Sequence, residues 1–246
     1  MSRDFEELDY RKTPLGELIL RRRRVLSLDV EVFEVKLGDA FLMSSLFHEV
    51  EVALANLALA ELGEGMWDVV VGGLGLGYTA GAALEHPSVR SVLVVEALAP
   101  VIEWHQRGLV PLGDRLTGDR RCRLAHGDFF ALADSEEGFD LENRGRLFHA
   151  VLLDIDHSPG NLLHARHGSF YQPEGLRALA RHLQPGGVFA MWSDEPPEDA
   201  FMEALDTTFD NVRAHKVSFA NPLLEAPSES TVYVARNAER TKPPFF

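Results

Sequence analysis

Cysteine is almost missing from the chain. Cys122 is the only one among 246 residues, so no disulfide can form within the chain. Disulfides are common in secreted domains and rare in the reducing cytosol, so the sequence favours a cytoplasmic protein. No apolar run approaches the roughly 18 residues that cross a bilayer, and no membrane span is expected. The charged first residues, MSRDFEELDYRK, contain no apolar stretch of the kind found in a secretory signal.

Positive charge is also scarce. There are 24 Lys and Arg residues against 38 Asp and Glu residues, which gives a formal net charge of −14. Such a surface repels phosphate backbones, so no nucleic-acid partner is expected. It suits a small cationic substrate, although acidity by itself also keeps proteins in solution. The one basic block, residues 21–24, is short and indicates a solvated strand or turn.

The hydrophobic pattern predicts an α/β fold. Residues 15–45 alternate between apolar and polar side chains, as strands do, and residues 46–62 change to helical spacing. After that, strands expected at 68–73, 91–97, 122–128, 148–156 and 187–194 alternate with helices at 79–86, 99–109, 172–183 and 197–209. Residues 212–219 and 230–236 can close the sheet as an antiparallel pair. Such alternation is typical of a mostly parallel sheet with helices on both faces.

Glycines and acids follow the first three of these strands. Gly73, Gly75 and Gly77 lie between a strand and a helix, where glycine lets the backbone approach a ligand. A tight turn packed on a helix is the alternative. Glu96 follows the second strand, where nucleotide-binding folds place an acid for the ribose hydroxyls. Asp128 follows the third strand and could accept a hydrogen bond from an exocyclic amine such as that of adenine.

These strand ends predict a nucleoside site, for either NAD or an S-adenosyl compound. The chain has no second half of a dinucleotide-binding fold, and the closing antiparallel pair fits the S-adenosyl type better. The expected fold is therefore a Rossmann-like, seven-stranded, mostly parallel sheet of the S-adenosylmethionine-dependent methyltransferase type. It divides into a small N-terminal β segment over residues 1–45 and an S-adenosyl-binding domain over residues 46–246.

The fourth strand ends in VLLDIDHSPG, with two acids one residue apart. On a strand, Asp154 and Asp156 share one face, where they could hold an ammonium group between them. An imidazole is the side chain suited to proton transfer near neutral pH, so His157 could act as a base or point to water. Alternatively, Asp156 belongs to a simple turn. We expect Tyr171 to line the acceptor pocket and Asp194 to reach the same cleft. His157, His164 and His167 match no metal-ligand spacing, so no metal is expected.

Motifs along residues 15–236 resemble, in order, those of the spermidine synthase (polyamine aminopropyltransferase) family. They are FHE at 47–49, VVVGGLGLG, VVEALAPVIEW, HGDFFAL, HAVLLDIDHSPG and SFYQPEGLRALARHLQPGGVFAMW. That family transfers an aminopropyl group from decarboxylated S-adenosylmethionine to a polyamine amine, in polyamine biosynthesis. The resemblance implies a transferase with this donor and a small cationic acceptor. The N-terminal β segment often carries oligomer contacts in the family, so a homodimer is a further expectation.

The resemblance also implies roles for individual residues. Glu96 would hold the ribose of the donor, and Asp128 its adenine. Asp154 would accept the proton of the attacking amine, which cannot attack while protonated. His48 and Glu49, from the FHE motif, would belong to the substrate site.

The sequence departs from the family pattern at three places. His157 stands where the family has its second Asp, Phe47 replaces a Tyr, and Leu74 or Leu76 replaces an acid in the glycine loop. The candidate catalytic residues are therefore Asp154, Asp156 and His157. Two other functions stay open. One is a small-molecule methyltransferase that uses intact S-adenosylmethionine, and the other is a non-catalytic relative that keeps the nucleoside site.

Overall fold

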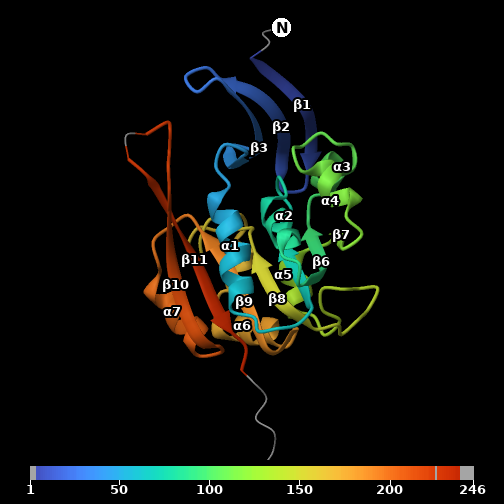
Figure 1. Cartoon of the computed structure of the whole chain (residues 1–246), viewed down its shortest axis with the longest axis vertical. Coiled ribbons are helices and arrows are strands. Elements are labelled where there is room, and N and C mark those ends of the chain that lie inside the picture. Colours follow the sequence, from blue (N-terminus) through green and yellow to red (C-terminus); the bar gives the residue numbers. More distant parts are fainter. Residues whose placement is uncertain (1–3, 225, 239–246) are drawn as a thin grey trace, which may run out of the picture.

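The chain forms two β-sheets, whose buried residues contribute to a shared hydrophobic cluster. The computed structural model describes residues 4–224 and 226–238, so the outermost ends of the two expected segments, 1–3 and 239–246, lie outside the described residues. A four-stranded sheet comes first in the chain, and a seven-stranded sheet with helices follows. Figure 1 shows the smaller sheet at one end of the molecule, and the chain leaves the larger sheet at the opposite end.

The smaller sheet is an antiparallel meander with strand order β1-β2-β3-β4. Its strands are β1 (Phe5–Thr13), β2 (Gly16–Val25), β3 (Val30–Leu37) and β4 (Ala40–Ser44). Alternating residues of β2 and β3, including Leu18, Leu20 and Val35, are buried. β1 was not predicted, because FEELDYRKT has too few apolar residues to show an alternating pattern.

The basic block lies on β2, as a strand rather than a turn. Arg21 and Arg23 project from the same face and both pair with Glu34 on the neighbouring strand. The Glu34 carboxylate is buried, so these two arginines offset its charge within the sheet.

The larger sheet has the strand order β10-β11-β9-β8-β5-β6-β7. Its strands are β5 (Trp67–Gly72), β6 (Val89–Glu96), β7 (Cys122–His126), β8 (Phe148–Leu153), β9 (Leu183–Ser193), β10 (Asp210–Phe219) and β11 (Ser228–Arg236). Strands β5 to β9 pair in parallel, and β10 and β11 close the sheet antiparallel, as expected. The strand order reverses between β5 and β8, and open α/β sheets bind ligands at such a point.

Helices cover both faces of this sheet because its strands are apolar on both sides. They are α1 (Glu49–Ala60), α2 (Tyr78–Glu85), α3 (Ala99–Gln106), α4 (Gly113–Gly118), α5 (Phe129–Asp134), η1 (Ala165–Ser169), α6 (Pro173–Ala180) and α7 (Asp199–Asp206). Helices α1 to α4 pack on the face that carries Val69 and Val71. Helices α5 to α7 pack on the opposite face with Val70. No helix in the described part of the chain is long and apolar enough to cross a membrane.

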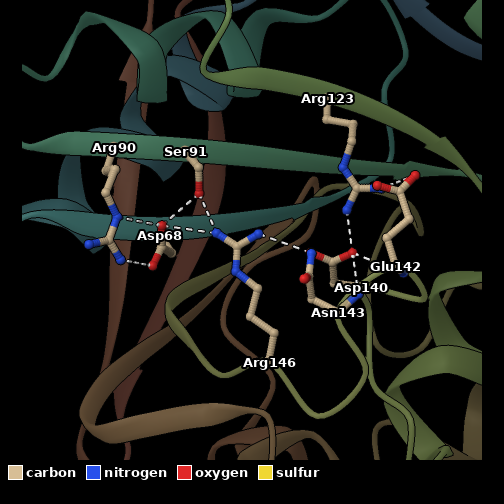
Figure 2. Close-up of polar contacts among 8 residues, drawn as sticks. All are labelled: Asp68, Arg90, Ser91, Arg123, Asp140, Glu142, Asn143 and Arg146. Carbon is tan, nitrogen blue, oxygen red and sulfur yellow. Dashed lines mark hydrogen bonds and ion pairs between the residues drawn. The ribbon is translucent and has the colours of Figure 1, made fainter.

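A network of charges ties the amino ends of the strands together (Figure 2). Arg146 lies between two buried acids, 3.0 Å from Asp68 on β5 and 3.0 Å from Asp140 in the loop before β8. Arg90 also bonds Asp68, and Arg123 also bonds Asp140. Burial raises the pKa of each acid, but these arginines outweigh it and lower both pKa values to about 2. The network lies at the end of the sheet opposite to the glycine loop.

Candidate active site

A cavity of about 280 Å³ lies at the carboxyl ends of the parallel strands. Its floor is formed by the loops that follow β5, β6, β7 and β8. Its roof comes from the smaller sheet, including Val35 and Leu37 on β3 and Met43 on β4. Trp192 and Phe219 form part of the apolar wall. The N-terminal sheet therefore covers the point where the strand order of the larger sheet reverses.

The glycine loop must pass very close to the end of β8. Gly73 has φ of 94°, and a Cβ atom there would lie 2.1 Å from the carbonyl oxygen of Asp154. Only glycine tolerates both conditions. Gly75 and Gly77 also have positive φ, and a Cβ on Gly75 would meet the sulfur of Met43 at 2.4 Å. Gly73 and Gly75 line the cavity, whereas Gly77 packs against Leu116 and His105 instead.

Four amides of this loop have hydrogen-bond partners within the protein. The Gly73 amide donates to Val95, and the Gly77 amide donates to Leu74. The Leu74 amide donates to Glu96, and the Gly75 amide helps to lower the pKa of the same acid. The fourth amide, on Leu76, donates to the thioether sulfur of Met43 at 3.0 Å. Because a thioether is a weak acceptor, this last bond is the one that a ligand displaces most readily.

Glu96 fastens the loop and still faces the cavity. Its two oxygens accept hydrogen bonds from the amides of Leu74 at 2.9 Å and Leu98 at 2.7 Å. Burial raises the pKa of Glu96, and these amide bonds partly oppose the rise. Each carboxylate oxygen has a second lone-pair direction that a ligand hydroxyl could use.

Asp128 caps a helix and also lines the cavity. Its Oδ1 accepts hydrogen bonds from the amides of Phe130 and Ala131 at the start of α5, which is ordinary N-cap geometry. Its Oδ2 pairs with Arg166 at 3.0 Å, and the Asp128 side chain is 31% exposed. The predicted contact with adenine would therefore be made by a carboxylate that already has a structural role.

Asp154 lies in the cavity, directly after β8. Its Oδ2 accepts a hydrogen bond of 2.6 Å from the hydroxyl of Thr79, which is buried in the first turn of α2. Burial raises the pKa of Asp154 to about 6, although the bond from Thr79 lowers it. A carboxylate that ionises near pH 6 can hold or release a proton near neutrality.

Glu51, which was not among the predicted residues, faces the same cavity from the first turn of α1. Burial and then the nearby charge of Asp154 raise its pKa to about 8. Acidic residues are common in the first turn of any helix, where the helix dipole favours them. The sequence therefore gives no signal that separates Glu51 from an ordinary surface acid.

Asp156 and Tyr171 lie together but outside the cavity lining. β8 ends at Leu153 rather than at residue 156, so the strand alternation does not extend to Asp156. Its buried carboxylate accepts hydrogen bonds from the Leu163 amide, from His167 Nδ1 and from the Tyr171 hydroxyl, at 2.7 to 3.0 Å. The two neighbouring acids, Asp154 and Asp156, therefore have different surroundings. Asp156 fixes the loop after β8, and Tyr171 donates its hydroxyl to that acid.

His157 and Asp194 form a pair at the cavity. His157 Nδ1 lies 3.3 Å from Asp194 Oδ2, and the Asp194 amide donates to the His157 carbonyl. His157 lines the cavity, whereas Asp194 is exposed and is not among the lining residues. Partial burial still raises the pKa of Asp194, and the nearby imidazole opposes the rise. If Nδ1 carries the proton toward Asp194, Nε2 is left as the nitrogen that can act as a base.

His48 and Glu49 start α1 and line the cavity. The His48 ring stacks on Tyr78 with 4.3 Å between ring centroids. Its Nδ1 is buried and has no hydrogen-bond partner among the described residues. The Glu49 carboxylate accepts a bond from the His48 amide at 3.0 Å, which satisfies one of the free N–H groups at the helix start.

His157, His164 and His167 all line the cavity but have different partners. His167 is buried against Asp156 and stacks on Phe130. His157 turns to Asp194 instead. Within residues 4–224 and 226–238, no three His, Cys, Asp or Glu side chains are arranged to hold a metal ion.

Fold and cavity together define a Rossmann-like protein with a cavity at its strand reversal, covered by an N-terminal sheet. Two solved structures with a similar fold are spermidine synthases. The enzyme from Thermotoga maritima superposes with a TM-score of 0.70 at 16% identity, covering 94% of this chain and 72% of that chain. A spermidine synthase in complex with the transition state analogue AdoDATO gives a TM-score of 0.71 at 17% identity, with 94% and 73% covered. The predicted fold is thereby confirmed.

Sequence similarity points the same way. The chain is 29% identical over 205 residues to Polyamine aminopropyltransferase 2 of Pseudomonas aeruginosa. That alignment covers 79% of this chain and 52% of the relative, so the chain spans about half the length of this curated protein. No family model matches the chain. The chain is thus similar in sequence and fold to polyamine aminopropyltransferases, and the resemblance expected from its motifs is confirmed.

Proposed function

We propose that the protein transfers an aminopropyl group from decarboxylated S-adenosylmethionine to an amine of a small polyamine. The observation that carries the proposal is the charge of the cavity. Five carboxylates line it: Glu49, Glu51, Glu96, Asp128 and Asp154. The one guanidinium in that lining, on Arg166, is already paired with Asp128. A cavity of this kind attracts cations, and both the sulfonium donor and the polyamine are cations.

The glycine loop supports the decarboxylated donor over intact S-adenosylmethionine. An intact donor brings a carboxylate to the region of Gly73 to Gly77, where it needs hydrogen-bond donors. Four of the loop amides already have partners in the protein, and only the Leu76 amide has a weak one, the sulfur of Met43. A decarboxylated donor needs none there, and its amino group adds a positive charge that the cavity can accommodate. Glu96 would hold the ribose hydroxyls, and Asp128 would accept from the adenine amine.

The reaction needs one base and no acid. Asp154 takes a proton from the acceptor ammonium, which frees the lone pair on its nitrogen. That nitrogen attacks the propyl carbon next to the sulfonium, so a C–N bond forms as the C–S bond breaks. Methylthioadenosine leaves as a neutral thioether, the new secondary amine keeps its proton, and Asp154 releases one proton to solvent. Positioning the two substrates in line supplies much of the rate.

Calorimetry and turnover assays test this proposal. Methylthioadenosine and decarboxylated S-adenosylmethionine should bind more tightly than intact S-adenosylmethionine, and putrescine should be aminopropylated. Asp154→Asn should lower kcat by at least about 100-fold, the usual contribution of a general base, and leave methylthioadenosine affinity within about threefold. Stronger binding of intact S-adenosylmethionine, with methyl transfer, would favour a methyltransferase. Donor binding without turnover of any polyamine would leave a non-catalytic relative.

A further inference from the structure

Glu51 is a half-buried acid with no positive partner among the described residues. The groups that act on its carboxylate are Asp154, Glu49 and its own backbone amide. Tyr78, also nearby, is neutral at pH 7 because burial and Glu51 raise its pKa. His48 stacks on Tyr78 and starts the same helix. None of these groups compensates a negative charge on Glu51.

The two acids reach the cavity from separate parts of the fold. Glu51 is in the first turn of α1, and Asp154 follows β8. Thr79 occupies one oxygen of Asp154 and leaves the other one available. Two carboxylates in one buried site cannot both ionise without a cation or a shared proton between them. The ligand-free protein supplies no such cation from its described residues.

The geometry points to Glu51 as the residue that selects the acceptor: its carboxylate and that of Asp154 together hold the acceptor's ammonium group in the cavity. This inference rests on the proposed aminopropyl transfer. The sequence predicted Asp154 and Asp156 as the two acids that hold the ammonium group. Asp156 faces inward and cannot serve as the second acid. The second carboxylate comes instead from α1, more than 100 residues earlier in the chain.

If Glu51 and Asp154 hold the ammonium group together, diamine binding should release protons to the buffer. Near pH 7 the ligand-free pair keeps one proton, since burial and Asp154 raise the pKa of Glu51 to about 8. An ammonium group placed between the acids lowers that pKa, so binding releases about one proton. A residue that only shapes the cavity would not change proton release.

The number of protons released is measured by calorimetry. Protein saturated with methylthioadenosine is titrated with putrescine at pH 7, in buffers of different ionisation enthalpy. The variants are Glu51→Gln, which keeps the shape of a protonated Glu51, and Glu51→Asp, which keeps the acid. Glu174→Gln is the matched control, because Glu174 is an exposed acid in the first turn of α6. Putrescine turnover is measured on the same four proteins.

Wild type and Glu174→Gln should release about one proton per diamine, and Glu51→Gln should release none. Loss of a hydrogen bond to a charged group should raise KM for putrescine on the order of 10- to 100-fold, with a smaller change in KM for the donor. Glu51→Asp should restore part of the proton release. Suppose that the wild type is active and that Glu51→Gln has the same proton release and the same KM for putrescine as Glu174→Gln. This result would overturn the role of Glu51 but leave the proposed function standing. A wild type that neither binds nor uses putrescine would overturn the proposed function as well.

Discussion

The hydrogen bond from Thr79 to Asp154 makes a quantitative prediction about the pH dependence of catalysis. Thr79→Val removes a 2.6 Å bond to the ionised form of Asp154 with little change in shape. Hydrogen bonds to charged groups contribute about 1.5–3 kcal/mol, which corresponds to about 1–2 pKa units. The pKa of Asp154, about 6 in the wild type, should therefore rise to between about 7 and 8.

The sign follows from the role of Asp154 as a base. Activity rises with pH as Asp154 loses its proton, so a higher pKa moves the acidic limb of the kcat/KM profile to higher pH. At pH 7 the ionised fraction should fall from about nine-tenths to between about one-tenth and one-half, and activity should fall in proportion. At pH 9 the variant should approach the wild type. Thr79→Ser, which keeps the hydroxyl, should retain the wild-type profile. An unchanged acidic limb in Thr79→Val would refute Asp154 as the base.

Three further predictions concern stability and donor binding. Arg146→Met leaves two buried carboxylates without the guanidinium they share. The free energy of unfolding, measured in urea, should fall by about 1–3 kcal/mol. A loss below about 0.5 kcal/mol would show that these ion pairs do not stabilise the fold. Glu51 has a raised pKa in the folded protein, so its contribution to the stability of ligand-free protein is greatest below about pH 4.5 and is lost as pH rises through about 8. Glu51→Gln should flatten that decline in thermal melts, and an equally steep decline would count against the raised pKa of Glu51. Gly73→Ala places a methyl group against a backbone carbonyl and should abolish methylthioadenosine binding, whereas Gly118→Ala, with open space around it, should bind as wild type does.

Strand and helix order could be predicted from the sequence because the parallel strands are short, fully apolar runs separated by helical spacing. The closing pair β10 and β11 was expected at nearly its observed position. β1 was missed because it is polar, and α4 and α5 were missed because six residues are too few to show helical periodicity. β9 begins at Leu183 and continues through QPGG, where a positive φ at Gly186 lets the strand pass its glycines.

The strand-end rule placed Gly73, Glu96, Asp128 and Asp154 on one cavity, since each follows a parallel strand directly. It could not place Asp156, because strand alternation ends wherever the strand ends, and three hydrogen-bond donors turn that side chain inward. The partnership of His157 with Asp194 depends on the packing of two loops.

The contact between Met43 and the glycine loop makes the two sheets interdependent in evolution. The sulfur fills the space that a side chain at residue 75 would need, and it accepts the one loop amide with a weak partner. A homologue that carries a larger residue at position 75 must therefore shorten position 43, and one that truncates position 43 exposes an amide able to bind an anion. Residues 43 and 75 should therefore covary among homologues, with glycine at position 75 wherever methionine stands at position 43.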